Sequence, residues 1–121
     1  ADMVLSYTTS PAYHIIAEED ETKVAAPFDE GHYMQVEVVG KLANSDQSDL
    51  ADAFMEFMVS DAAQSVLPTT NWMYPAIMPK DGLPAAFDQS IEPEKALLIP
   101  NEAVPALRKE ALAEWLSALS Q

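Results

Sequence analysis

The sequence predicts an α/β fold in which helices flank an incomplete sheet. Segments with strand and helix periodicity follow one another in the order strand, helix, strand, helix. With 121 residues, 49% of them hydrophobic, the chain has enough apolar side chains for one core. Only two segments have strand character, which is too few for a stable sheet. Further strands are therefore expected from elsewhere in a longer protein or from a second copy.

The first expected strand, residues 3–7, leads directly into a helix. Ser10 can cap that helix, and Pro11 suits its first position because the N–H that proline lacks has no helical partner there. The helix is expected to end within the acidic run 18–21, and residues 27–31 are expected to form a loop. This strand-to-helix turn, at the carboxyl end of a strand, is where α/β proteins commonly bind ligands.

The second expected strand covers residues 34–39, in which polar and apolar side chains alternate. A helix is then expected to begin at Asp46 or Ser48, and a short one to cover residues 61–66. The apolar residues of the longer helix recur at spacings of three and four, which predicts an amphipathic helix that packs on a neighbour. These residues are Leu50, Phe54, Phe57 and Met58.

A stretch rich in proline, which carries Trp72, separates these helices from the last one. Its breaks are Pro68, Pro75, Pro79 and Pro84, and they indicate loops, where binding residues are commonly found. Residues 102–119 are expected to form the final helix, with Asn101 as its cap and Pro105 in its first turn. Trp115 lies on the apolar stripe of this helix and is expected in the core.

The charge of the chain excludes several kinds of partner. Twenty acidic residues against six basic ones give a net charge of -14, which would repel nucleic acids and anionic membrane surfaces. The same field would attract a small cation, or would favour solubility in a salty environment, and charge alone leaves both readings open. No apolar run approaches the roughly 20 residues of a bilayer span, so no direct membrane insertion is expected. The strand pattern at the very start suggests a piece of a longer polypeptide.

The sequence offers no pattern typical of an enzyme. It has no cysteine, so thiolate nucleophiles and cysteine metal sites are excluded within it, and neither a nucleophile elbow nor a phosphate-binding glycine loop is present. His14 and His32 are not at metal-ligand spacing and are expected to be structural. The acidic run 18–21 lacks the glycine and alternating oxygen ligands of a calcium loop and is expected to be solvated surface. We therefore expect a protein that is not an enzyme, without a metal or cofactor.

Aromatic residues in turns are the best candidates for a binding site. Tyr7, Tyr13 and Trp72 lie beside hydroxyl groups, Asn71 and prolines rather than at core spacing. Flat aromatic faces suit a heteroaromatic or cationic ligand, because they stack on rings and attract positive charge. Ordinary packing at the edge of the fold explains the two tyrosines about equally well.

Thr8, Thr9 and Ser10 add hydroxyl groups at the expected helix N-terminus. Unpaired N–H groups and the helix dipole make such an end suitable for an anion, although simple capping of the helix explains the same residues. The two interpretations are compatible with each other.

Four segments carry a resemblance to a known family. They are residues 6–14 (SYTTSPAYH), 30–38 (EGHYMQVEV), 54–60 (FMEFMVS) with Gln64, and 70–75 (TNWMYP). In order, and across essentially the whole chain, they resemble the C-terminal part of the periplasmic thiamine-binding proteins of ABC importers. Those proteins have the type II periplasmic-binding-protein fold, with two lobes and two to three times this length. Residues 80–82 and 88–100 depart from the expected pattern.

The resemblance implies the solute-binding component of an ABC importer in the bacterial periplasm. It would bind thiamine, and its phosphates, in an aromatic cleft between lobes and deliver it to a membrane permease. Residues 1–121 would form a single C-terminal segment, in which residues 1–14 hold the crossing between lobes and the ligand-site turn. Residues 33–121 would complete the first lobe, and the N-terminal part of the same protein would supply the rest.

The resemblance also assigns ligand-binding roles to individual residues. Tyr7, Tyr13 and Trp72 match the aromatic positions that pack around the ligand in the family. Thr8, Ser10 and Asn71 are weaker candidates for polar contacts. The helix N-terminus at Ser10 would lie toward the phosphate end of phosphorylated thiamine.

Three alternatives remain open from the sequence. Iron receptors of the same fold use paired tyrosine ligands, so capture of ferric iron is one alternative. A polyamine receptor of the same fold is a second alternative. Thiamine-degrading enzymes share this kind of scaffold, but they depend on a cysteine nucleophile that residues 1–121 lack.

Overall fold

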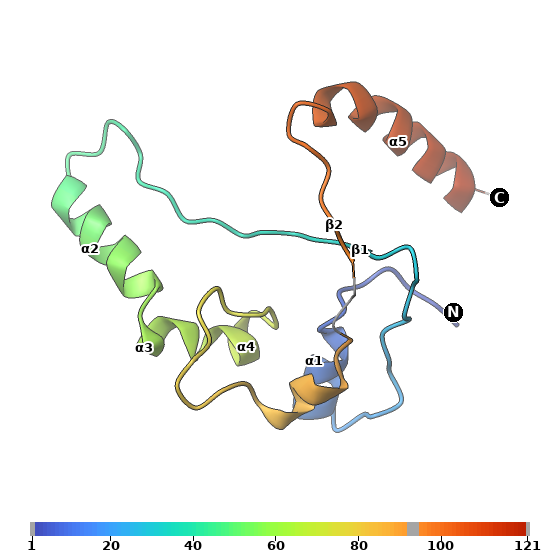
Figure 1. Ribbon diagram of the computed structural model, residues 1–121, viewed down its shortest axis with the longest axis horizontal. Coiled ribbons are helices and arrows are strands. Elements are labelled where there is room, and N and C mark those ends of the chain that lie inside the picture. The colour runs from blue at the N-terminus through green and yellow to red at the C-terminus, as the bar shows by residue number, and fades with distance from the viewer. Residues whose placement is uncertain (1, 92–94, 121) are drawn as a thin grey trace.

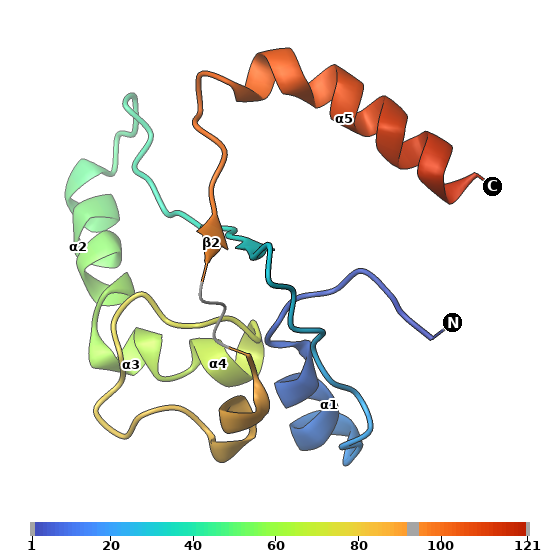
Figure 2. The same ribbon diagram turned by 45° about the vertical axis from the view of Figure 1, so that its right-hand side comes forward.

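The computed structural model describes residues 2–91 and 95–120. The elements in chain order are α1 (Ser10–Glu18), β1 (His32–Tyr33), α2 (Ser48–Met58), α3 (Asp61–Gln64), α4 (Leu67–Thr70), the 3-10 helix η1 (Ala85–Gln89), β2 (Ala96–Leu97) and α5 (Val104–Leu119). Figures 1 and 2 show α1 beside η1, the helices α2 to α4 in succession, and α5 standing apart from them all. The fold thus combines helices with a small central sheet.

The core is small and lies where α1 meets η1. Ala12 of α1 is fully buried, and Phe87 of η1 is 4% exposed. The accessible surface is 9858 Å², whereas a compact monomer of 13.2 kDa would have about 6,400 Å². Large apolar side chains on α2, α5 and the extended segments consequently remain exposed.

The sheet consists of β1 and β2, which run parallel with His32 opposite Ala96 and Tyr33 opposite Leu97. The chain enters β1 through Gly31, whose φ is +105°. A Cβ at that position would lie 2.6 Å from the carbonyl oxygen of Lys95. Only glycine therefore lets the two strands approach as they do.

The first strand prediction was wrong, and the second was wrong in extent. Residues 3–7 form no strand, and Leu5 is 82% exposed, because no described segment lies beside them to pair with. The second strand begins at His32, and its last ladder contact is the 2.8 Å bond from the Met34 N–H to the Leu97 oxygen. Residues 35–39 extend beyond this pairing as exposed chain. The partner strand β2 was not predicted.

The helix predictions were closer. The helix expected after residues 3–7 and the long amphipathic helix are confirmed as α1 and α2. The predicted cap of α1 was wrong by one residue, because Thr9 is the cap residue and Ser10 is the first helical residue. The short helix ends at Gln64 and is followed by α4, inside the stretch predicted as loop. The last helix begins at Val104 with Ala103 as its cap residue, so the prediction of Asn101 was wrong.

Two packing predictions also need correction. Trp115 is 47% exposed, because no described element covers that part of α5. The apolar face of α2 is likewise open, with Phe54 and Phe57 each 51% exposed. Amphipathic periodicity identified these faces, but burial requires an opposing surface that the described chain does not supply.

Candidate functional site

Tyr13 and Trp72 form an aromatic pair, although 59 positions separate them in the sequence. Their ring centroids are 5.1 Å apart, and the ring planes meet at 78°, an edge-to-face arrangement. Tyr13 lies on α1, and Trp72 directly follows the cap residue of α4. Tyr13 is 37% exposed and Trp72 is half-buried. Two of the three predicted aromatic residues are thus brought together at the surface.

The backbone at Trp72 is unusual and is held by Thr9. Trp72 has a φ of +57°, in the left-handed region that a bulky side chain rarely adopts. The hydroxyl of Thr9 donates a 2.6 Å hydrogen bond to the Trp72 carbonyl oxygen, and Thr9 is 4% exposed. The sequence predicts Thr9 only as one of three hydroxyl groups at the helix N-terminus. Its position directly before Ser10 and Pro11 gave no indication of a contact with residue 72.

Tyr7 lies in the turn that enters α1, and Ser10 holds its main chain. The Tyr7 N–H donates to the Ser10 hydroxyl at 3.2 Å, and the Ser10 N–H donates to the Tyr7 carbonyl at 3.0 Å. The Tyr7 side chain is 55% exposed. Among the described residues, its ring makes no aromatic contact like that between Tyr13 and Trp72. Its ring is therefore open to a ligand or to another part of the protein.

The N-terminus of α1 has fewer free donors than the sequence suggested. Main-chain carbonyls already accept the N–H groups of Ser10 and Ala12, while Pro11 has no N–H to offer. The Ser10 hydroxyl lies 2.6 Å from the Ser6 hydroxyl, and Thr8 is half-buried in the same turn. Hydroxyl groups rather than main-chain N–H groups are thus the principal polar atoms at this end of the helix.

Asn71 adjoins the aromatic pair and contacts an acidic residue. Its side-chain amide donates a 2.9 Å hydrogen bond to the carboxylate of Glu37, which lies in the extended segment after β1. Glu37 is one of the polar residues in the alternating pattern of residues 34–39, and that pattern does not indicate a contact with Asn71. The contact places a carboxylate beside the residue that precedes Trp72.

The loop that carries Trp72 is tied to α3 at two further points. Gln64 accepts a 3.0 Å hydrogen bond from the Ile77 N–H, and Asp61 accepts a 2.8 Å bond from the Lys80 N–H. Gln64 is 4% exposed. The loop after Trp72 is therefore anchored to α3 at Ile77 and Lys80.

The two histidines make ordinary polar contacts. His14 lies 2.6 Å from the Glu18 carboxylate, and this hydrogen bond lowers the pKa of Glu18 below its ordinary value. The Nε2 atom of His32 donates to the Ala26 carbonyl, which can only accept. Residues 2–91 and 95–120 contain no group of three His, Asp or Glu side chains placed to hold a metal ion. In the same residues, no helix has the length and apolarity needed to cross a bilayer.

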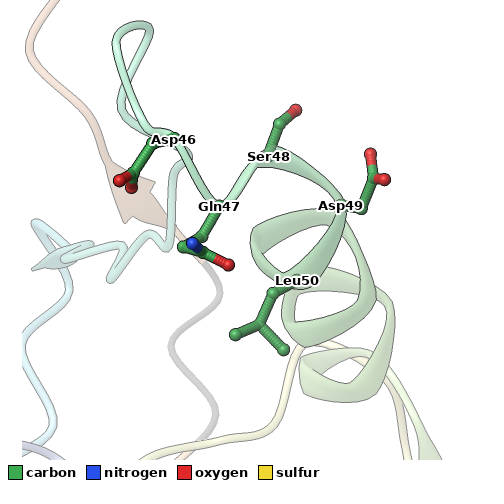
Figure 3. A pocket seen from close by; sticks show the side chains of 5 residues that line it. All are labelled: Asp46, Gln47, Ser48, Asp49 and Leu50. Atoms are coloured by element: carbon green, nitrogen blue, oxygen red, sulfur yellow. The ribbon is translucent and has the colours of Figure 1, made fainter.

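Two shallow hollows lie away from the aromatic pair. One, shown in Figure 3, is at the start of α2 and is lined by Asp46, Gln47, Ser48, Asp49 and Leu50, with a volume of about 170 Å³. The other, of about 270 Å³, is an apolar groove between Tyr33 and α5. Neither contains a predicted site residue. The rings of Tyr13 and Trp72 instead meet nearly at right angles at the surface, and we call this arrangement the aromatic corner. It has the geometry of one wall of a binding site.

Relatives of the chain are binding proteins of the bacterial periplasm. A "Thiamine-binding periplasmic protein" of Salmonella typhimurium is 47% identical over 121 residues, which are all of this chain and 36% of that protein. The protein of the same name from Escherichia coli K12 is also 47% identical, with the same coverage. That of Haemophilus influenzae is 38% identical over 117 residues, or 97% of this chain and 33% of the relative. The chain thus spans about a third of the length of these curated relatives.

A solved structure and a family model agree with these relatives. The structure, a "Periplasmic thiamin binding protein", is 46% identical, with a TM-score of 0.81 over 96% of this chain and 36% of that one. This likeness confirms the predicted fold class, part of a type II periplasmic-binding-protein fold. The model described as "Bacterial extracellular solute-binding protein" matches residues 2–104. The chain therefore belongs to the bacterial extracellular solute-binding protein family.

Proposed function

We propose that this chain is part of the periplasmic receptor of an ABC importer, and that the receptor binds thiamine and its phosphates. The relatives that share nearly half of its residues are named thiamine-binding periplasmic proteins. Within the receptor, Tyr7, Tyr13 and Trp72 would contact the ligand rings, and Thr8, Ser10 and Asn71 would make polar contacts.

The observation that carries the proposal is the Tyr13 and Trp72 pair. Two rings meeting at 78° form a corner whose faces can receive a flat ligand from two directions. Thiamine joins a thiazolium cation to an aminopyrimidine ring, so it can both stack and make a cation–π contact. The net charge of -14 favours the approach of such a cation.

The other wall of the proposed cleft would come from a part of the full-length protein outside this chain. The relatives are about three times as long as this chain, which covers 36% of them. The exposed ring of Tyr7 and the open corner at Trp72 are suited to face another lobe. Closure of two lobes around the ligand would exclude water and present the closed receptor to a membrane permease.

The proposed role involves no chemical change in the ligand. The relatives are named as binding proteins. Residues 1–121 contain no cysteine to serve as the nucleophile of a thiamine-degrading enzyme. Recovery of intact thiamine after prolonged incubation with the full-length protein is the expected result, and its loss would revive the enzymatic alternative.

Calorimetric titration of thiamine into the full-length protein tests the proposal. Tight binding is expected for the wild-type protein, a loss of at least tenfold in affinity for Trp72→Ala, and a smaller loss for Trp72→Phe, which keeps a ring. Spermidine and ferric citrate are titrated in parallel. Binding of either one in place of thiamine, with a visible charge-transfer band in the case of iron, would overturn the proposal.

A further inference from the structure

Thr9 occupies a position at which its side chain would ordinarily cap a helix. It is the residue before the first helical residue of α1, and threonine at such a position commonly accepts a hydrogen bond from an N–H in the first turn. In this structure its hydroxyl makes no capping bond to α1. It donates instead to the carbonyl oxygen of Trp72, 63 residues away. The local interaction expected of this residue type has been replaced by a long-range one.

The acceptor of this bond belongs to a residue in a costly conformation. A φ of +57° at Trp72 brings Cβ close to its own main chain, and the surroundings must hold a non-glycine residue there. The bond from Thr9 fixes the orientation of the peptide group that follows Trp72. Because the ψ angle of Trp72 relates that peptide plane to the Cα–Cβ bond, holding the plane also influences where the indole ring lies.

Thr9 is also placed where it can hold the rings of Tyr13 and Trp72 in a fixed relative position. It is one turn of helix before Tyr13, and its hydroxyl contacts Trp72 directly. The bond is 2.6 Å long and 4% of Thr9 is exposed, so solvent does not readily substitute for either partner. One side chain thereby links the helix that carries Tyr13 to the loop that carries Trp72.

We propose that Thr9 is a positioning residue of the ligand site, which sets the indole ring of Trp72 against Tyr13 before ligand arrives. The proposal rests on the proposed function for its ligand, thiamine, but not for its geometry. Preorganisation of this kind improves affinity because the ring need not be ordered when the ligand binds. Thr9 itself is not required to touch the ligand.

The test uses full-length protein labelled with 5-fluorotryptophan, in which loss of a ¹⁹F resonance in Trp72→Phe assigns the signal of Trp72. Thr9→Val removes the hydroxyl at nearly constant volume, and Thr9→Ser keeps it. Thr70→Val is the matched control, since the Thr70 hydroxyl also donates to a carbonyl, that of Val66, but within its own helical segment. The ¹⁹F spectrum without ligand, the thiamine affinity and the thermal midpoint are measured for each variant.

Thr9→Val is expected to shift or broaden the Trp72 resonance and to weaken thiamine binding about tenfold at a temperature where the protein is folded. Thr9→Ser should restore both, and Thr70→Val should change neither. A lower thermal midpoint for Thr9→Val with an unchanged resonance and affinity would overturn the proposal, because Thr9 would then be only a structural tie. Equal effects of Thr70→Val would overturn it as well.

Two further outcomes are also decisive. If the wild-type protein does not bind thiamine, the proposed function fails, while the ¹⁹F comparison still decides whether Thr9 positions the ring. If Thr9→Val does not fold, Thr9→Ala is compared with Thr9→Ser by the same readouts, and an unchanged Trp72 resonance in Thr9→Ala overturns the proposal.

Discussion

The side-chain carbonyl of Gln64 accepts a 3.0 Å hydrogen bond from the main-chain N–H of Ile77, and so joins α3 to the loop after Trp72. The other end of the same amide donates to the Met58 carbonyl at 2.6 Å. Because an N–H needs an acceptor and a carbonyl needs a donor, these partners fix the orientation of the amide. Gln64 is thus a buried group with both of its ends satisfied.

Gln64→Glu is expected to destabilise the protein by about 2 kcal/mol, because it replaces the donor to Met58 with an oxygen and buries a charge. Urea unfolding of the full-length protein measures the change. Gln35→Glu makes the same chemical change on an exposed residue and should alter the unfolding free energy by less than about 0.5 kcal/mol. Equal effects of the two substitutions would show that the hydrogen bonds of Gln64 contribute little to the free energy of unfolding.

Gly31→Ala is expected to disrupt the pairing of β1 with β2. A Cβ at this position would lie 2.6 Å from the Lys95 carbonyl oxygen, and the φ of +105° is itself unfavourable for alanine. A loss of about 2 kcal/mol or more in the free energy of unfolding follows. Gly40→Ala is the control, because no atom of the described residues lies within 4 Å of a Cβ there. Similar stability of the two variants would contradict the close approach of Gly31 to Lys95.

The longer helices α1, α2 and α5 could be predicted from the sequence because their determinants are local. The spacing of Leu50, Phe54 and Phe57 predicts α2 without knowledge of any partner. Strands depend on neighbours, so alternation over residues 34–39 could not show that pairing stops at Met34. Burial is also a property of partners, which is why the prediction of a buried Trp115 was wrong.

The site could be predicted only as a set of residue types. Aromatic residues in turns identified Tyr13 and Trp72 as candidates, and the structure brings their rings together. The roles of Thr9 and Glu37 depend on contacts across 63 and 34 residues, which no local pattern encodes. Ligand binding by the predicted residues remains a prediction, which substitutions of Trp72, Tyr13 and Ser10 test.

The carboxyl group of Asp20 is expected to titrate below its ordinary pKa of 3.8. Hydrogen bonds from Thr22 are the largest cause, followed by that from Lys23, since both stabilise the ionised form. A lowered folded pKa means that the contribution of Asp20 to stability is present above pH 3.8 and is lost as the pH falls below it. The ¹³C shift of the Asp20 carboxyl group, followed by NMR during an acid titration, measures the midpoint.

Thr22→Val is expected to raise that midpoint toward 3.8, because it removes the hydroxyl donor while keeping the shape of the side chain. Thr69→Val, far from Asp20 in the sequence, should leave the midpoint unchanged. A wild-type midpoint at or above 3.8 would contradict the described hydrogen bonds.

Tyr13→Leu is expected to weaken thiamine binding about tenfold, because it removes one of the two rings that form the aromatic corner. Tyr13→Phe keeps the ring and should stay within about threefold of the wild-type affinity. Calorimetric titration of the full-length variants measures both values. If Tyr13→Phe were as weak as Tyr13→Leu, the hydroxyl group rather than the ring would be the important part of Tyr13.

Ser10→Asp is expected to weaken the binding of thiamine diphosphate about tenfold, while the affinity for thiamine changes by less than about threefold. The main-chain N–H groups of Ser10 and Ala12 are already bonded, so a phosphate at this end of α1 would depend on hydroxyl groups such as that of Ser10. An added carboxylate would repel the diphosphate and not the thiazolium cation. Ser10→Asn, which is similar in size but uncharged, separates repulsion from loss of the bonds to Ser6 and Tyr7. Undiminished affinity of Ser10→Asp for thiamine diphosphate would place the phosphate end elsewhere, whereas equal losses for Asp and Asn would mean that Ser10 acts by holding the main chain of Tyr7.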